Sequence, residues 1–331
     1  MSNIKIIDYF LYNGEPIVEF RLNYLDDVVD YFVLIESKYT HSGNKKPFLY
    51  SEKNKELFKK YEKKLMIIII DEFPDRYDYE KLEKVLKFNK DKIDLYEEAW
   101  LREKYNRNYA YDIIINHFKE PFIIMVCDVD EIPNKNKVKH LYSGYDILHD
   151  GLKIQMSLLC YGFRWKFENY NWYCPFVITD KKLRDKTFSL DLMRMNGYFD
   201  KDNVKYIING GWHITSCLTP NDIIRKLESF SHVECNKERI KNRNYILKCM
   251  LSGRFFETSK NKIEVLIPTT ENELPENYKT FQEKMDNLIF LENDDNDNND
   301  NNDNNDNNDN NDNNDNNDNN DNNDNDNYFR K

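Results

Sequence analysis

Long apolar segments are missing from this 331-residue chain. The longest uninterrupted apolar runs, residues 65–70 and 121–127, are far shorter than the roughly 20 residues that a helix needs to cross a bilayer. The first residues contain no basic stretch followed by a long apolar run, so neither a signal peptide nor a membrane anchor is predicted. We therefore expect a soluble, cytoplasmic protein.

Paired cysteines and glycosylation acceptor sites are also missing. The chain has 6 cysteines and no Cys-x-x-Cys motif, and Cys127 lies inside a predicted buried strand. Asparagine is abundant, yet no Asn-x-Ser/Thr acceptor sequence occurs. Both absences favour free thiols in a reducing compartment.

A strong charge of either sign is missing once the C-terminal segment is set aside. Residues 293–327 are almost entirely Asn and Asp, with no apolar side chain to offset the entropy lost on ordering. Without the 13 aspartates of this segment, the net charge of −11 becomes about +2, from 46 acidic and 48 basic side chains. The sequence therefore predicts a folded domain over residues 1–292 and a disordered tail over 293–331, and charge alone gives no argument for nucleic-acid binding.

The first part of the folded domain alternates between strand and helix patterns. Strands are predicted at 4–11, 31–36, 65–70 and 122–127, with helices at 16–25, 53–64 and 91–118 between them. Further strands are predicted at 153–167, 170–180 and 206–217, and helices at 220–230, 237–251 and 275–291. This order indicates an α/β domain with a mostly parallel, Rossmann-like central sheet.

Two aspartates, Asp128 and Asp130, follow the buried strand 122–127 directly. Open α/β sheets bind ligands at the carboxyl ends of their strands, and two hard oxygen donors there suit a divalent cation that holds a phosphate. A solvated acidic turn after a strand is the alternative interpretation of so short a motif. The neighbouring strand ends must therefore decide between the two.

Other polar side chains are predicted to share this edge of the sheet. Glu36, Ser37 and Asp71 follow two neighbouring strands and would read the base and ribose of a nucleotide, although each is also an ordinary polar residue at a strand end. The helix before the Asp-x-Asp strand carries three more candidates, and an arginine directed into the cleft would match a diphosphate. These candidates are Arg102, Arg107 and Asn108, and a solvated helix surface is the alternative for them.

A third group of candidates lies in the sequence Gly210-Gly211-Trp212-His213. Glycine lets the backbone approach a ligand closely, tryptophan offers a flat face to a sugar ring, and a neutral imidazole is a good ligand for a divalent metal. A structural role in a strand is equally compatible with this motif. The aromatic residues of the same region, among them Trp165 and Trp172, suit either a carbohydrate site or a core.

Taken in order, these motifs resemble glycosyltransferase family 17 from about residue 7 to 291. The resemblance rests on residues 27–37, on the helix 100–108, on Val126-Cys-Asp-Val-Asp-Glu-Ile-Pro133 and on Gly211-Trp-His213 with Cys217-Leu-Thr-Pro220. It implies a GT-A-type fold and inverting transfer of a sugar, foremost N-acetylglucosamine, from a UDP-sugar to a hydroxyl of a glycan or glycoprotein. The animal members are Golgi proteins with a membrane anchor, which this sequence does not show, so the acceptor stays open.

The resemblance also implies roles for particular residues. Asp128, Asp130 and His213 would bind Mn²⁺ or Mg²⁺ together with the diphosphate, and Gly211 and Trp212 would contact the donor. The carboxylate base that assists the attacking hydroxyl is not identified by the sequence, and the candidates are Glu131 at the rim of the metal site, Glu168 and Asp180.

Two other functions use similar residues. Phosphatases with an aspartate nucleophile follow the pattern Asp-x-Asp-x-Thr/Val, but the fifth position here is Ile132, and that chemistry leaves His213 unexplained. A sugar-nucleotide or glycan-binding protein without turnover is the second alternative, and it would keep the same cleft.

Overall fold

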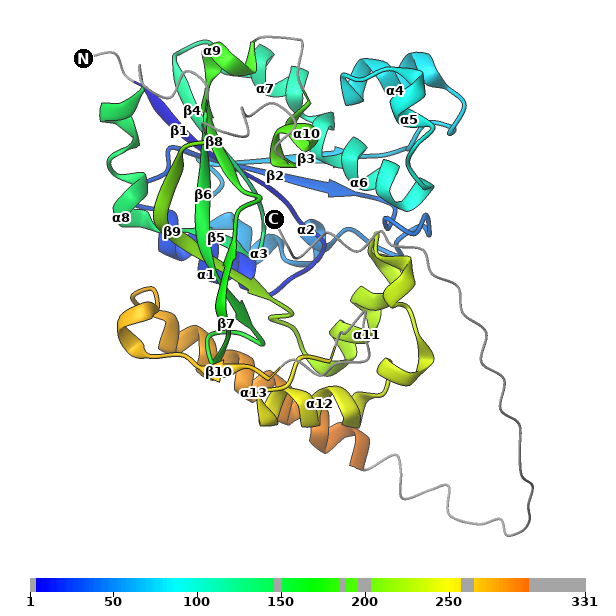
Figure 1. Ribbon diagram of the computed structural model, residues 1–331, viewed down its shortest axis with the longest axis vertical. Helices are drawn as coiled ribbons and strands as arrows, with labels where there is room; N and C mark the ends of the chain where they lie inside the picture. The colour runs from blue at the N-terminus through cyan, green and yellow to red at the C-terminus, as the bar shows by residue number, and fades with distance from the viewer. Residues whose placement is uncertain (1–3, 146–150, 185–188, 196–203, 257–264, 298–331) are drawn as a thin grey trace. The chain divides into compact units, whose positions relative to one another are not determined.

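The computed structural model describes residues 4–145, 151–184, 189–195, 204–256 and 265–297. The chain divides into two units, Met1–Leu291 and Glu292–Lys331, and the first holds all strands of the described residues (Figure 1). The strands are β1 (Lys5–Leu11), β2 (Tyr31–Ser37), β3 (Leu65–Ile70), β4 (Phe122–Asp128), β5 (Glu131–Pro133), β6 (Leu152–Cys160), β7 (Trp165–Trp172), β8 (Phe176–Thr179), β9 (Tyr206–Thr215) and β10 (Ile267–Pro268). The α-helices are α1 (Ile17–Leu25), α2 (Tyr50–Lys53), α3 (Lys55–Lys59), α4 (Tyr79–Leu86), α5 (Lys90–Ile93), α6 (Glu98–Tyr109), α7 (Tyr111–His117), α8 (Lys135–Val138), α9 (Asp180–Leu183), α10 (Leu190–Arg194), α11 (Pro220–Ser229), α12 (Arg243–Ser252) and α13 (Tyr278–Asp297).

Four parallel strands form one half of the sheet in the order β4-β1-β2-β3. β4 buries all six of its apolar residues, as expected for a strand covered on both faces. Because the strands are parallel, their carboxyl ends lie along one edge, where Leu11 of β1 is the neighbour of Asp128 of β4. The alternation of strands and helices in the sequence correctly predicted this part of the sheet.

Beyond β4 the sheet is mixed. β8 pairs antiparallel with β4 and β6, and β7 pairs antiparallel with β6. β9 runs parallel to β6 and antiparallel to the short β5, which begins at the residue after Asp130. The single strand predicted at 153–167 is in fact the β6–β7 hairpin, because Tyr161 and Gly162, with φ of 58° and 88°, reverse the chain.

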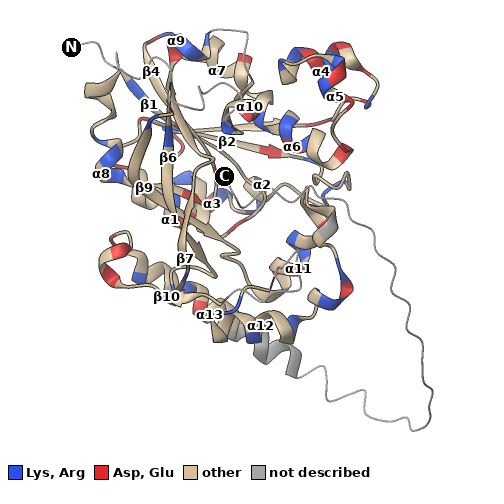
Figure 2. Ribbon diagram, viewed as in Figure 1, with Lys and Arg blue, Asp and Glu red and all other residues tan. Residues whose placement is uncertain are grey.

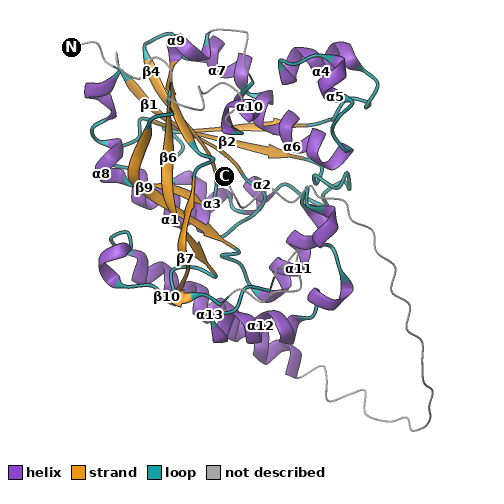
Figure 3. Ribbon diagram, viewed as in Figure 1, coloured by secondary structure: helices purple, strands orange, loops and turns teal. Residues whose placement is uncertain are grey.

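Helices cover both faces of the sheet, so the domain is a mixed α/β fold (Figure 3). Along β4, Ile123, Met125 and Cys127 pack with α1, α3 and α8, whereas the alternate residues pack with α4–α7, α9 and α10. A smaller cluster joins α11 and α12 to the hairpin. Asp128 continues the second series, so its side chain lies on the α6 side of the sheet.

Two predicted segments differ from the structure. Residues 91–118 are three helices, α5, α6 and α7, rather than one. Tyr105 and Tyr111 both pack in the same core, although six residues are about 240° apart on a continuous helix, and the break at Ala110 reconciles their positions. The last helix, α13, continues to Asp297, because extending an existing helix costs less than starting one. Residues 293–297 are therefore helical, and the rest of the predicted tail, 298–331, lies outside the described residues.

No helix in the described ranges is both long and apolar enough to cross a membrane.

Candidate active site

Two arginines hold the carboxylate of Asp128. Arg107 of α6 donates to its Oδ1 at 2.6 Å, and Arg194 of α10 donates to its Oδ2 at 2.5 Å. Both arginines are buried, whereas the side chain of Asp128 is 31% exposed. Burial by itself would raise the pKa of Asp128, but the two guanidinium groups outweigh it and hold this pKa well below its ordinary value. Asp128 is therefore ionised at neutral pH and orients two arginines at the edge of the sheet.

Glu131 lies underneath this group rather than at its rim, where the resemblance placed it. It is fully buried, and it accepts from both Nη atoms of Arg194, from the indole of Trp172 at 2.5 Å and from the backbone N–H of Asp128 at 2.6 Å. With both oxygens engaged, Glu131 fixes Arg194 and is not exposed to a substrate hydroxyl. The prediction that it acts as the base does not fit this placement.

A buried ion pair supports the backbone of the same turn. Arg21 of α1 and Asp8 of β1 are both 0% exposed, and the guanidinium meets the carboxylate at 2.8 Å through Nε and 2.5 Å through Nη2. Its remaining nitrogen, Nη1, donates to the carbonyls of Asp128, Val129 and Glu131 at 2.9, 3.2 and 2.7 Å. One side chain therefore binds three carbonyls of the Asp-x-Asp turn and sets its path.

Asp130 and His213 lie side by side. Their Oδ1 and Nε2 atoms are 3.6 Å apart, because β5 follows Asp130 and pairs with β9 so that Glu131 lies opposite His213. Burial would raise the pKa of Asp130, but His213 and Lys226 hold it below its ordinary value. The sequence named both residues of this pair, and only the antiparallel β5–β9 pairing brings them together.

These residues fit a divalent cation that a substrate helps to bind. In the described part of the chain, no group of three or more His, Cys, Asp or Glu side chains gathers as a metal site. Mg²⁺ is often held by only one or two carboxylates plus the phosphates of the substrate, and Asp130 could supply one carboxylate with the His213 imidazole beside it. The Nε2 atom of His213 lies beside Asp130 and could bind the cation, whereas the Nδ1 atom is buried without a hydrogen-bond partner. Asp128, by contrast, would have to give up its hydrogen bond to Arg107 or Arg194 before it could bind the metal.

One carboxyl at this edge was missed by the sequence analysis. Glu15 follows β1, accepts from the backbone N–H of Asn13 at 2.7 Å and lies within electrostatic reach of Asp130 and Lys226. Burial, reinforced by the Asp130 carboxylate, raises the pKa of Glu15. Arg21 and Arg194 were missed as well. A lone Asp8 in an apolar strand and a lone Arg21 in an apolar helix were the available signs of a buried pair, whereas nothing in the sequence marked Arg194.

The predicted nucleotide-reading residues have other partners. Glu36 is buried, and its two carboxylate oxygens accept from the backbone N–H groups of Tyr50 and Ser51 at 2.7 and 2.9 Å, at the start of α2. Ser37 accepts from a backbone N–H two residues on. Asp71 pairs with Lys38 at 2.5 Å and lies three strands from β4, roughly 14 Å away across the sheet. Of these, Glu36 is a helix cap and Asp71 is remote from Asp128.

Of the three helix candidates, only Arg107 meets Asp128. Arg102 donates to the carbonyl of His41 at 3.2 Å and so holds the loop after β2. Asn108 is buried, and its Oδ1 accepts from Ser189 at 3.0 Å and from the backbone N–H of Leu190 at 2.8 Å. Asn108 therefore anchors the start of α10, the helix that carries Arg194.

Gly211 and Trp212, predicted to contact the donor, have other partners in the structure. A Cβ on Gly211 would lie 2.2 Å from the carbonyl oxygen of Ile132, so the glycine allows β9 to pair closely with β5. Trp212 alternates with His213 along β9 and points to the opposite face, where it is 7% exposed and donates to the carbonyl of Glu273 at 2.6 Å. This buried position does not fit the prediction that Trp212 contacts the donor sugar.

Asp180 lies at the wrong end of the sheet to act as the base. It accepts from the backbone N–H of Phe122 at 3.3 Å, at the first residue of β4, whereas Asp128 is the last. Seven residues of strand separate the two ends by roughly 20 Å. Glu168 is exposed on β7, and its role in catalysis stays a prediction.

Lys153 is a buried amine behind Arg194. Its Nζ donates to the carbonyls of Arg194 and Cys174 at 2.5 and 3.1 Å, and burial lowers its pKa to about 7. Between this pKa and the ordinary value near 10.4, the unfolded chain binds more protons than the folded one, so Lys153 makes stability rise with pH.

We expect this rise to disappear in Lys153→Met. Urea denaturation at pH 7 and 8.5 should show that the unfolding free energy of the native protein increases relative to that of the variant by on the order of 1 kcal/mol. The comparison cancels the opposing titration of the buried cysteines. If the unfolding free energies of the native protein and of Lys153→Met differ by the same amount at both pH values, Lys153 stays protonated in the fold.

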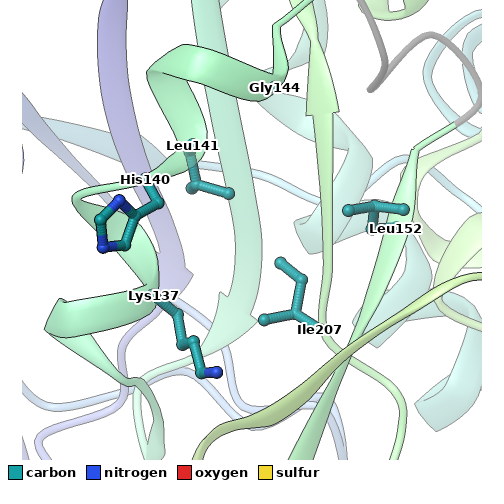
Figure 4. A pocket seen from close by; sticks show the side chains of 6 residues that line it. All are labelled: Lys137, His140, Leu141, Gly144, Leu152 and Ile207. Carbon is teal, nitrogen blue, oxygen red and sulfur yellow. The ribbon is translucent and has the colours of Figure 1, made fainter.

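A cavity of about 230 Å³ lies away from this site. The side chains of Leu141, Leu152 and Ile207 converge on it between α8 and β9 (Figure 4). A smaller adjoining cavity is lined in part by Met125, which faces the α1 side of β4. The cavity therefore lies across the sheet from Asp128, and its nearly apolar lining offers little to a nucleotide.

Comparison with known proteins gives a family. The model of glycosyltransferase family 17 matches residues 1–290. The β-1,4-mannosyl-glycoprotein 4-β-N-acetylglucosaminyltransferases of Homo sapiens and Rattus norvegicus are each 23% identical over 317 residues, which cover 86% of this chain and 55% of those proteins. The chain thus spans about half the length of the curated relatives it matches. Among solved structures, the 4-diphosphocytidyl-2C-methyl-D-erythritol synthase of Anaerococcus prevotii is 8% identical over 62% of this chain and 86% of that one, with a TM-score of 0.33, too low to support an argument.

Proposed function

Because this chain belongs to glycosyltransferase family 17, we propose that it transfers N-acetylglucosamine from UDP-N-acetylglucosamine to a glycan hydroxyl, with inversion and with Mn²⁺ or Mg²⁺ bound at Asp130 and His213. The relatives named above act on a mannosyl glycoprotein, which makes a glycan or glycoprotein the proposed acceptor. A parallel block of strands with the Asp-x-Asp motif at its carboxyl edge supports a GT-A-type nucleotide-sugar fold.

The observation that carries the proposal is the contact between Asp130 and His213 beside two buried arginines. An oxygen and a nitrogen ligand 3.6 Å apart suit one cation. The Nη atoms of Arg107 and Arg194 donate to carboxylates of this region, and their two guanidinium groups add positive charge at the same turn, which would attract a diphosphate. A bound cation would neutralise the charge that develops on the departing diphosphate.

The residues of this chain then have separate tasks. Asp128 and Glu131 hold Arg107 and Arg194 in fixed positions, so that little reorganisation is needed when the donor binds. Arg21 fixes the turn from beneath. The arrangement argues against an aspartate-nucleophile phosphatase, because the carboxylate oxygens of Asp128 already accept from two arginines.

A donor screen tests the proposal. The protein is incubated with UDP-N-acetylglucosamine, UDP-galactose or UDP-glucose, and UDP release is measured with Mn²⁺, with Mg²⁺ and with EDTA. We expect metal-dependent release that is fastest with UDP-N-acetylglucosamine and absent with EDTA, because the diphosphate needs the cation.

p-Nitrophenyl phosphate provides the control substrate. Phosphate release from it without UDP release would favour the phosphatase. Metal-dependent UDP binding with neither hydrolysis nor transfer would favour a binding protein that has lost turnover.

A further inference from the structure

An uncharged aromatic surface leads away from the Asp130–His213 pair. The rings of Trp172 and His213 are 4.6 Å apart, and Tyr173, the residue after Trp172, packs against Tyr206 of β9 with ring centres 5.3 Å apart. β7 and β9 pair with opposite edges of β6, so the two ring pairs lie on three neighbouring strands and at the end of β7. We call this surface the aromatic strip. It consists of Gln155, Trp172, Tyr173, Tyr206, Ile208 and Asn209.

The strip is exposed where it leaves the site. Tyr206 is 41% and Ile208 is 53% exposed, and Ile207 between them points to the other face, into the cavity of Figure 4. The strip is anchored at the site, because the indole of Trp172 donates to Glu131 at 2.5 Å. Trp172 thus belongs both to the strip and to the residues that hold Arg194.

Amide groups lie among the rings. The Nε2 of Gln155 donates to the Tyr173 hydroxyl at 3.1 Å, and the backbone N–H of Asn209 donates to the Oε1 of Gln155 at 3.3 Å. The side chain of Asn209 is exposed beside Ile208. Flat aromatic faces with amide donors and acceptors between them match a sugar, which offers C–H faces and hydroxyl groups.

The lack of charge on the aromatic strip favours a sugar over an acidic peptide or a nucleic acid. β9 has no Lys, Arg, Asp or Glu and is tan along its length in Figure 2, whereas α4 and α5 show acidic and basic residues together. None of the six residues of the strip is charged, although charged residues make up 32% of the chain. An acidic peptide or a nucleic acid would find no cation among these six residues.

We propose that the aromatic strip binds a neutral oligosaccharide, the acceptor, and presents its hydroxyl to the donor at Asp130 and His213. This inference rests on the proposed function. It assigns Trp172 to the junction of donor and acceptor, and Tyr206 and Ile208 to sugar residues further from the reacting hydroxyl.

The test separates acceptor binding from donor chemistry. The protein, with Mn²⁺ and UDP, is applied to an array of neutral, sialylated and sulfated oligosaccharides, and metal-dependent hydrolysis of UDP-N-acetylglucosamine is measured in parallel. We expect binding to neutral oligosaccharides that falls at least about tenfold in Tyr206→Ser/Ile208→Ser, because two apolar contacts are lost, while hydrolysis stays unchanged. Tyr77→Ser/Leu251→Ser is the matched control, since Tyr77 also packs edge-on against a tyrosine and both residues are exposed.

Each outcome tests either the aromatic strip or the proposed function. Equal array binding by native protein and Tyr206→Ser/Ile208→Ser, or no binding to any neutral oligosaccharide, would overturn the strip as an acceptor site. A change in oligomeric state of that variant by sedimentation, without a change in glycan binding, would assign the strip to self-association instead. If the native protein does not hydrolyse UDP-N-acetylglucosamine, the proposed function is wrong, and this result says nothing against the strip.

Discussion

Arg21→Met is expected to destabilise the fold by about 3–5 kcal/mol, because it leaves the carboxyl group of Asp8 unpaired in the core. Both side chains are 0% exposed, so water cannot replace the lost partner. The substitution also removes the donor shared by the carbonyls of Asp128, Val129 and Glu131. Chemical denaturation measures the first effect, and calorimetric titration with UDP and Mn²⁺ measures the second.

A double variant separates the two roles of Arg21. Asp8→Leu/Arg21→Met removes both charges, and replacement of a buried ion pair by apolar side chains is often neutral for stability. We therefore expect the double variant to regain most of the lost stability and still bind UDP with Mn²⁺ at least about tenfold more weakly, since the turn has lost its support. Arg21→Lys keeps the positive charge but not the contact with three carbonyls. We expect its stability and its UDP binding to lie between those of the native protein and of Arg21→Met. Native-like UDP binding by the double variant would show that Arg21 only stabilises the core.

Asp130→Asn is expected to lower metal-dependent turnover by about 10²–10³-fold with little change in stability. In the described part of the chain, the side chain of Asp130 contacts His213 at 3.6 Å, so we expect the fold to depend little on its charge. UDP release at saturating Mn²⁺ and the midpoint of urea denaturation are the two measurements. Normal Mn²⁺-dependent release by this variant would remove Asp130 from the metal site.

Asp128→Asn provides the contrast. It loosens two buried arginines, so we expect a loss of both activity and about 1–3 kcal/mol of stability. Because the pKa of Asp128 is lowered in the fold, its contribution is present above the ordinary pKa near 3.9 and is lost as the pH falls below it. The native protein should therefore lose more stability than Asp128→Asn between pH 5 and 3. Equal acid sensitivity would contradict the two arginine contacts.

Local pattern in the sequence was enough to predict the parallel strands and several residues of the candidate site. Residues 122–127 had to be a strand buried on both faces, and Thr219 and Pro220 begin α11 as predicted, with the Thr219 hydroxyl accepting from the backbone N–H of Asp222 at 3.3 Å. Asp128, Asp130 and Arg107 were identified because a strand end and a helix face are local properties. The order of the motifs along the chain was also enough to indicate glycosyltransferase family 17.

Contacts between distant segments decided the rest. Arg194 reaches Asp128 across 66 residues and Arg21 across 107, and no periodicity encodes such a partner. Trp212 and His213 are adjacent in sequence, but the pleat of β9 sends one into the core and the other to Asp130. Asp180 was a reasonable base in the sequence until the antiparallel β4–β8 pairing put it at the opposite end of β4. The sequence by itself determined which side chains could do the chemistry, and the tertiary structure decided which of them meet, because the pairing of strands far apart in the chain sets the face and the edge on which each side chain lies.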